Sequence, residues 1–162
     1  MSDIEITKPE LKLEKYAFLR LYEHDLEMAL QTLKVFRRCR NQEVKCALLR
    51  DITVTYCRPF SESKGNNFKK HHFNLNKFES ETMKNLHEKI IGLRNSLFAH
   101  TDLHFKNPKI ANWSTDEKKW FPMSFTGFDY TQLEDKISEI ELLIKYSRQQ
   151  LLIKMKKLED TL

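Results

Sequence analysis

A regular apolar seam near the middle of the chain constrains the fold more than any other feature of the sequence. Its members follow one another at intervals of three and four residues: Met83, Leu86, Ile90, Leu93 and Leu97. This spacing places the apolar side chains on one face of an α-helix, so the pattern predicts an amphipathic helix that buries this face. Asn76 and Glu79 precede the seam and are predicted to cap the helix.

Three further segments are predicted to be helical, and the scarcity of helix breakers supports this, since the 162 residues include three glycines and four prolines. Residues 7–39 begin with a threonine that predicts an N-cap. Asn41 is predicted to cap a second helix, which ends near Arg58 because the residue before a proline disfavours the helical conformation. Residues 52–56 are rich in β-branched side chains, but helical periodicity on either side favours a helix. A capping box at Thr131 predicts a last helix of roughly thirty residues.

Two segments interrupt this helical pattern. Residues 60–75 are polar and basic without periodicity, which indicates a loop. Residues 101–130 hold both tryptophans among prolines and a glycine, which indicates an irregular or hairpin insertion between the third and fourth helices. Trp113, Trp120 and Phe121 are expected to cover the end of the bundle or, alternatively, the aromatic residues of this segment stack on unpaired bases. The whole chain is therefore predicted to be a single all-α domain over residues 1–162, a four-helix up-and-down bundle with an insertion at about 101–130.

Several classes of protein are excluded by the composition. No apolar run approaches the ~20 residues of a transmembrane helix, and the acidic start of the chain lacks the features of a signal peptide. We therefore expect a soluble, cytoplasmic protein without membrane association. The three cysteines show no C-x-x-C spacing, so the sequence indicates reduced thiols rather than a disulfide framework or a zinc ribbon.

Positive charge is concentrated in one part of the chain. Residues 34–72 contain ten lysines and arginines but three acids, and the net charge of the whole chain is +5. This asymmetry is typical either of a binding surface for an anion such as nucleic acid or of a solvated basic face. The run Lys69, Lys70, His71 and His72 is the predicted RNA-binding part of this stretch, although an exposed loop tip has the same composition. His104, further along the chain, is also predicted to bind RNA.

The side chains best suited to catalysis lie at the end of the apolar seam. Continuing the helical step from Leu97 leads to His100 and then to His104, which places imidazoles where apolar side chains are expected. Arg94 precedes His100 by six residues, a separation of about 120° and about 9 Å along an ideal helix. The two converge only if the helix distorts or ends, or if a two-fold dimer sets one pair opposite the other. Asn95 adds a donor and an acceptor beside them.

Other interpretations of these histidines stay open. His100 on its own is typical of a cap on the last carbonyls of a helix. His100 and His104 are spaced for a metal, but no glutamate follows His100 as in H-E-x-x-H, so no metal or cofactor is predicted. His87 lies seven residues before Arg94 and is a candidate for positioning it. His24 is expected to be a surface residue.

The succession of Arg94, Asn95 and, after four intervening residues, His100 resembles the short signature of HEPN domains. In that family an arginine followed by a polar residue precedes a histidine near the end of a helix. The resemblance implies a small all-α bundle, a homodimer in which the two motifs face each other, and a metal-independent endoribonuclease of a toxin–antitoxin or phage-defence system. It also implies an RNA substrate and a cognate antitoxin or a nucleotidyltransferase as partner.

Under this resemblance the three residues have distinct catalytic roles. His100 acts as general acid or base because the reference pKa of imidazole, about 6.5, lies near neutral pH. Arg94 offsets the negative charge that develops on the phosphorane oxygens, and Asn95 assists. RNA alone supplies the attacking 2′-hydroxyl, so DNA is not expected to be cleaved. The alternative is a noncatalytic HEPN-like helical dimer that binds a partner protein, a nucleotide or nucleic acid.

Overall fold

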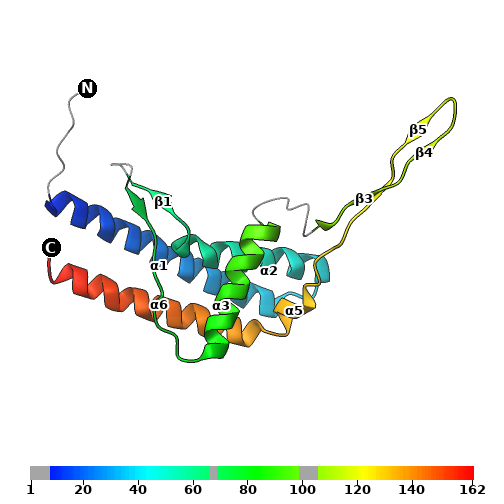
Figure 1. Ribbon diagram of the computed structural model, residues 1–162. Coiled ribbons are helices and arrows are strands. Elements are labelled where there is room, and N and C mark those ends of the chain that lie inside the picture. Colours follow the sequence, from blue (N-terminus) through cyan, green and yellow to red (C-terminus); the bar gives the residue numbers. More distant parts are fainter. Residues whose placement is uncertain (1–7, 66–68, 99–105) are drawn as a thin grey trace, which may run out of the picture.

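Two long antiparallel helices form the frame of the molecule. The computed structural model describes residues 8–65, 69–98 and 106–162. Helices α1 (Lys8–Arg38) and α6 (Ile137–Glu159) lie side by side with opposite directions (Figure 1). At their free ends the Lys12 ammonium donates to the Thr161 carbonyl at 2.9 Å, and the Tyr16 hydroxyl donates to Glu159 Oε1 at 2.5 Å. The first and last helices therefore bring the two ends of the described chain together.

Two shorter helices complete the core. Helix α2 (Gln42–Cys57) packs along α1, and α3 (Glu81–Leu93) lies across α2 and α6 (Figure 1). The side chains between them are mostly leucines and isoleucines, and those almost fully buried include Leu26, Leu33, Leu49, Ile52, Ile90, Leu143, Ile144 and Leu151. The predicted seam of α3 contributes to this core as expected. The all-α class predicted from the sequence is confirmed.

A buried tyrosine joins three of these helices. Tyr56 on α2 is fully buried, and its hydroxyl lies 2.7 Å from Nδ1 of His87 on α3 and 3.2 Å from the Ser147 hydroxyl on α6. A buried hydroxyl needs such partners because an unpaired polar atom in the core costs free energy. Residues 52–56 lie within α2 and are therefore helical, as their neighbours' periodicity predicted.

The start of α3 differs from the prediction. The Asn41 cap of α2 is confirmed, since its side chain accepts from the Val44 amide at 3.0 Å. The cap of α3 is Ser80, whose hydroxyl accepts from the Met83 amide at 3.1 Å, so the predicted cap at Asn76 and Glu79 is wrong. Residues 72–79 form no helix, because the segment instead delivers buried Phe73 to the core.

The predicted last helix is divided in two. A short helix, α5 (Thr131–Glu134), precedes α6 and is separated from it by a turn. The capping box at Thr131 is wrong because Thr131 is already the first residue of α5, and its amide and hydroxyl donate to Asp129 Oδ1 at 3.0 and 2.6 Å. Glu134 does not reach back along its own helix, since it bonds the Lys45 ammonium of α2 at 2.6 Å.

The predicted loop of residues 60–75 contains a small hairpin. After a 3-10 turn, η1 (Arg58–Phe60), strand β1 (Ser63–Lys64) pairs with β2 (Lys70–His71) in antiparallel register. The pair lies beside α1 (Figure 1). It gives the basic run of the sequence a fixed place at one side of the helices.

The insertion before α5 is a second, longer hairpin. Strand β3 (Lys109–Ile110) pairs with β6 (Met123–Ser124), and β4 (Trp113–Ser114) pairs with β5 (Lys119–Trp120). Figure 1 shows this arm projecting away from the helices. Trp113 and Trp120 are opposite each other and are 70% and 61% exposed, so the expectation that they cover the helix ends is wrong.

Within the described ranges, none of the helices is both long and apolar enough to cross a lipid bilayer. The cysteines are free thiols, as expected, and Cys57 is buried, which raises the pKa of its thiol to about 12.

The free energy of unfolding is predicted to decrease at mildly acidic pH because of His87. Burial lowers the pKa of this imidazole below the ordinary 6.5, so the unfolded chain takes up a proton at a higher pH than the folded chain. The stabilisation is complete above about pH 6.5 and is lost as the pH falls from there towards the folded pKa. Urea unfolding of His87→Gln at about pH 7.5 and 5.5 should show a weaker pH dependence than the parent. The exposed His24→Gln variant is the control, and an equal pH dependence in His87→Gln and parent would contradict this account.

Candidate functional site

Arg94 lies at the point where α3 changes its geometry. The helix continues from Leu93 into η2 (Arg94–Phe98), a turn of π-helix. Such turns are rare and often occur at functional sites. The α-helical register that predicted His100 on the apolar seam therefore stops at Leu93, and Leu97 and Phe98 beyond it are only partly buried.

The Arg94 guanidinium is poorly satisfied by its surroundings. One Nη donates to Asn95 Oδ1 at 2.9 Å. Nε is buried and has no hydrogen-bond partner, and no carboxylate forms an ion pair with the guanidinium in the parts of the chain that the structure describes. A buried donor without an acceptor costs about 1–3 kcal/mol. A bound anion that interacts with the rest of the guanidinium would offset part of that cost.

The side chain of Arg94 borders an open groove of about 430 Å³. Its walls come from α1, η1 and β1, and the residues that matter for its chemistry are Tyr22, His24, Asp25, Arg58, Glu62 and Arg94. The volume lies within the range of roughly 300–1,000 Å³ that small-molecule sites occupy. Tyr22 contributes a second buried polar atom, since its hydroxyl makes no hydrogen bond of ordinary geometry within the described residues. Burial raises the Tyr22 pKa, while the nearby Ser63 hydroxyl lowers it to a smaller extent.

The two carboxylates in the groove are already paired with other cations. Asp25 accepts from the Arg58 guanidinium at 3.2 Å. Glu62 lies 2.6 Å from the Lys70 ammonium, which lowers the Glu62 pKa. Among the described residues, Arg94 is therefore a cation of the groove without a counter-charge. A guanidinium in this state is suited to bind a phosphate, because its planar set of donors matches two phosphate oxygens.

The remaining members of the predicted catalytic set are only partly placed. Asn95 is exposed and accepts the bond from Arg94. His100 and His104 lie outside the described residues. His87 does not position Arg94, because its ring is packed against Phe60 and Phe78 and bonded to Tyr56. The prediction of a positioning role for His87 is therefore wrong.

The basic run of the sequence is divided between different roles. Lys69 is exposed, and Lys70 forms its ion pair with Glu62. The His71 ring stacks on Phe18 with 4.3 Å between centroids, and its Nε2 lies 2.7 Å from Glu14 Oε1. His72 is exposed. Together with Lys15 and Lys154, which the sequence analysis missed, Lys70, His71 and His72 line a second pocket beside the groove.

Pairing within the fold reduces the charge asymmetry that the sequence shows. Within the described residues, four lysines and arginines of residues 34–72 form ion pairs with acids: Arg37 with Glu141, Lys45 with Glu134, Arg58 with Asp25, and Lys70 with Glu62. Two of these acids come from α5 and α6, far along the chain. The basic stretch is therefore a less continuous surface than the count of its residues indicates.

Some residues of the groove carry no signal in the sequence. His24 is exposed, as predicted, but it shares the groove with Arg94 and Arg58, which lie 70 and 34 positions away along the chain. No spacing rule connects them, because η1 reaches α1 only through tertiary packing. In the described residues, no cluster of three or more histidine, cysteine or acidic side chains is arranged to hold a metal ion.

No protein-family model matches the chain, and the comparisons with curated proteins and with solved structures found no significant match.

Replacement of Arg94 by methionine is predicted to leave the free energy of unfolding unchanged or to increase it by about 1 kcal/mol, because the change removes an unsatisfied buried donor. Arg148→Met is the matched control. Arg148 donates through Nε and Nη2 to Glu23 Oε1 at 2.9 and 2.6 Å, so its loss should cost about 1–2 kcal/mol. Urea unfolding of both variants measures the difference, and a larger loss in Arg94→Met would show that Arg94 serves the fold.

Proposed function

We propose that the protein is a metal-independent endoribonuclease of the HEPN type, with an active site formed by Arg94, Asn95 and His100. The observation that carries the proposal is the unsatisfied Arg94 guanidinium at the π-helical end of α3, on the wall of an open groove. A nuclease of this kind needs a fixed cation that is free to receive a phosphate. The proposal includes a cytoplasmic homodimer with a four-helix HEPN-like fold, in a toxin or phage-defence setting.

The proposed reaction is a transesterification within the RNA strand. One His100 imidazole takes the proton of a 2′-hydroxyl, whose oxygen then attacks the adjacent phosphorus. The bond from phosphorus to the 5′-oxygen of the next nucleotide breaks, and the imidazolium of the second protomer's motif supplies a proton to that oxygen. Arg94 stabilises the additional negative charge on the phosphorane. The products are a 2′,3′-cyclic phosphate and a 5′-hydroxyl, so no oxidant, metal or cofactor takes part.

An exposed apolar stripe on α1 supports the dimer. Leu21, Met28 and Val35 follow one another at intervals of seven residues, which places them along one side of the helix, and they are 59%, 44% and 54% exposed. Leu21 also borders the groove of Arg94. A second copy that covers this stripe would bring the two grooves close together, as the two-motif chemistry requires.

The hairpin arm supports binding of unpaired RNA. Trp113 and Trp120 form a cross-strand pair on the exposed arm, and Phe121 is also exposed there. Aromatic faces of this kind bind single-stranded nucleic acid because each base can stack on them, with about 1–3 kcal/mol per base.

Incubation of the purified protein with a loop-containing RNA in the presence of a chelator tests the proposal. We expect cleavage with 2′,3′-cyclic phosphate ends and none of the matching DNA. Arg94→Gln should reduce the rate by about 100-fold or more, and His100→Ala by a similar factor. Arg38→Gln, which removes an exposed cation, should cleave as the parent does. Salt-dependent RNA binding with no fragments would instead favour the noncatalytic alternative.

Disruption of the α1 stripe is predicted to abolish both dimerisation and cleavage. Met28→Glu places a charge in the middle of the stripe, so light scattering should show a monomer and the cleavage rate should fall in parallel. Leu142→Glu on α6 is the control, since it introduces the same charge at a side chain that is 60% exposed. A fully active monomeric Met28→Glu variant would contradict the two-motif mechanism.

A further inference from the structure

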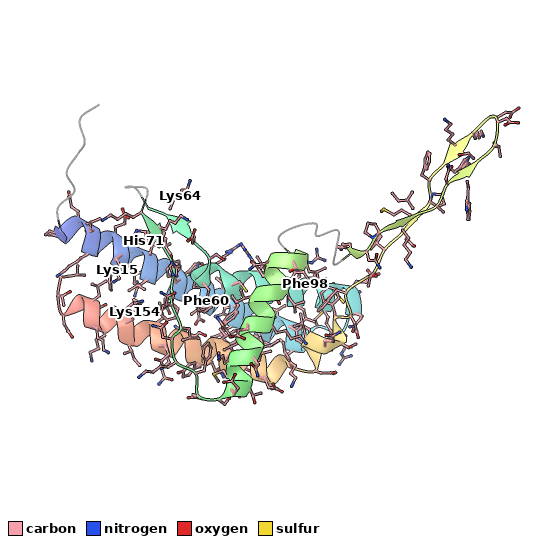
Figure 2. All side chains as sticks on the ribbon, in the orientation of Figure 1. Lys15, Phe60, Lys64, His71, Phe98 and Lys154 are labelled. Carbon is pink, nitrogen blue, oxygen red and sulfur yellow. The ribbon has the colours of Figure 1, made fainter. Side chains whose placement is uncertain are left out.

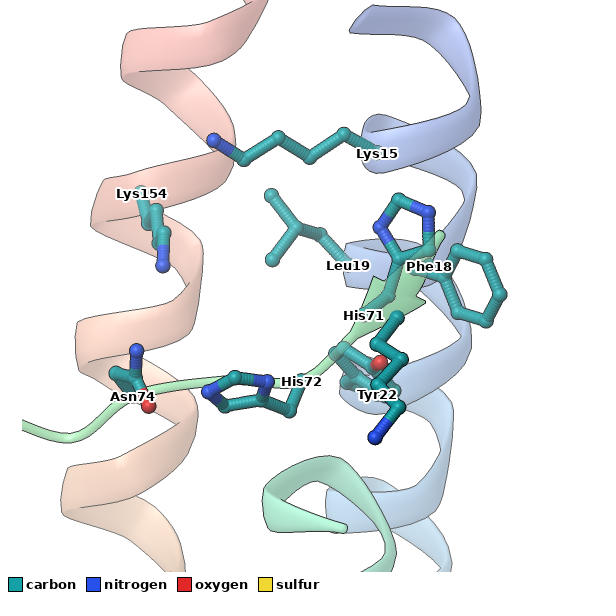
Figure 3. A pocket seen from close by; sticks show the side chains of 9 residues that line it. Lys15, Phe18, Leu19, Tyr22, His71, His72, Asn74 and Lys154 are labelled. Atoms are coloured by element: carbon teal, nitrogen blue, oxygen red, sulfur yellow. The ribbon is translucent and has the colours of Figure 1, made fainter. Parts of the chain in front are cut away.

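A small basic pocket lies beside the groove of Arg94, between the free ends of the two long helices and the segment that follows β2. Figure 2 places Lys15, His71 and Lys154 together in this region, away from the hairpin arm. The pocket has a volume of about 230 Å³. In Figure 3, Lys15 extends from α1 towards α6, and Lys154, His72 and Asn74 surround the same space.

Two of the lysines that line the pocket, Lys15 and Lys154, repel each other, and the described residues provide neither with an acidic partner. Partial burial lowers the Lys154 pKa, and the Lys15 charge lowers it further. Neither ammonium forms an ion pair in the described parts of the chain, and the Lys154 ammonium lies over the face of the Phe73 ring, 5.3 Å from its centroid. Like charges held together in this way favour a bound anion.

Other cationic side chains of the pocket already have partners within the fold, so the groups that can bind a ligand are the remaining ones. Lys70 is paired with Glu62, and His71 is held by Glu14 and Phe18. Among the described residues, His72 and Asn74 make no hydrogen bond, and both are exposed beside the two lysines. The anchored His71 fixes the strand from which His72 and Asn74 project. Two ammonium groups, an imidazole and an amide thus surround one space.

The size and charge of the pocket define the group that it accepts. Its volume is below the roughly 300–1,000 Å³ of sites that enclose a whole drug-sized ligand, so it suits a small anionic group. A phosphomonoester carries about −1.5 to −2 charges at pH 7 and three acceptor oxygens, which matches two ammonium groups and their polar neighbours. We propose that this pocket binds the phosphomonoester of a nucleotide, at the end of an RNA strand.

The position of the pocket connects it with the groove. Phe18 and Tyr22 line both, so a strand that lies in the groove of Arg94 can place its terminal phosphate between Lys15 and Lys154. The identity of the ligand as RNA rests on the proposed function, whereas binding of a phosphomonoester does not. The pocket would then fix the distance between the phosphorylated end of the strand and the position that is cleaved.

Fluorescence anisotropy with short 2′-O-methyl RNA tests the pocket, because this RNA lacks the attacking hydroxyl and cannot be cleaved. The strand is compared with a 5′-phosphate, a 3′-phosphate and hydroxyl ends. We expect one terminal phosphate to strengthen binding by about tenfold, the effect of one charge-assisted hydrogen bond. Lys15→Gln and Lys154→Gln should abolish this gain, while Lys157→Gln on the exposed side of α6 should keep it. The unfolding midpoints of the two pocket variants should be equal to or higher than that of the parent, because repulsion is relieved.

Competition identifies the source of the phosphate. Inorganic phosphate in excess should abolish the gain in affinity that the terminal phosphate provides. If adenosine monophosphate competes as strongly as the phosphorylated strand, the pocket is assigned to free nucleotides. Equal affinity for phosphorylated and hydroxyl ends, or an equal loss in Lys157→Gln, would overturn the proposal. The two proposals fail separately: a gain that persists in a protein without nuclease activity supports the pocket alone, and cleavage without a gain supports the nuclease alone.

Discussion

The antiparallel packing of α1 against α6 is the interaction on which the rest of the structure depends. It joins the first and last helices through a leucine-rich core and through Arg148, which binds Glu23 and Glu27 of α1. Helices α2 and α3 pack on this frame around the buried Tyr56, whose hydroxyl lies within hydrogen-bond distance of His87 on α3 and Ser147 on α6. The end of α3 is thereby fixed beside α1, where Arg94 meets the groove. The same packing sets Lys154 near Lys15, although 139 positions separate them in the sequence.

Buried or crowded cations without an acidic partner in the described chain characterise the two sites. Most cations near them are neutralised by acids from other elements, as Arg58 is by Asp25 and Lys70 by Glu62. Arg94, Lys15 and Lys154 have no such partner in the described ranges of the chain. Folded proteins rarely leave buried or crowded cations unpaired, because desolvation and repulsion both cost free energy. Such positions are consistent with binding of an anion from outside the chain.

Local patterns predicted the helices well, and tertiary contacts determined what those patterns missed. The seam of α3 and the Asn41 cap depend on neighbouring residues, so the sequence was sufficient for them. Helix α3 begins after Ser80, later than predicted, because the preceding segment buries Phe73 in the core. The break before α6 lies beside Glu134, which binds Lys45 of another helix. Neither event has a local signal. For the site, the sequence singled out Arg94 and Asn95, but the groove around them required the fold.

The central claim is that Arg94 is kept unpaired to receive a phosphate of RNA. Its buried Nε–H reports this directly by NMR of ¹⁵N-labelled protein, with the resonance assigned by its absence in Arg94→Met. On addition of an uncleavable 2′-O-methyl RNA, the account predicts that the Arg94 Nε–H resonance shifts as its guanidinium binds a phosphate, while that of Arg148, already bonded to Glu23, stays in place. An Arg94 resonance that does not move while the RNA is bound would contradict the account.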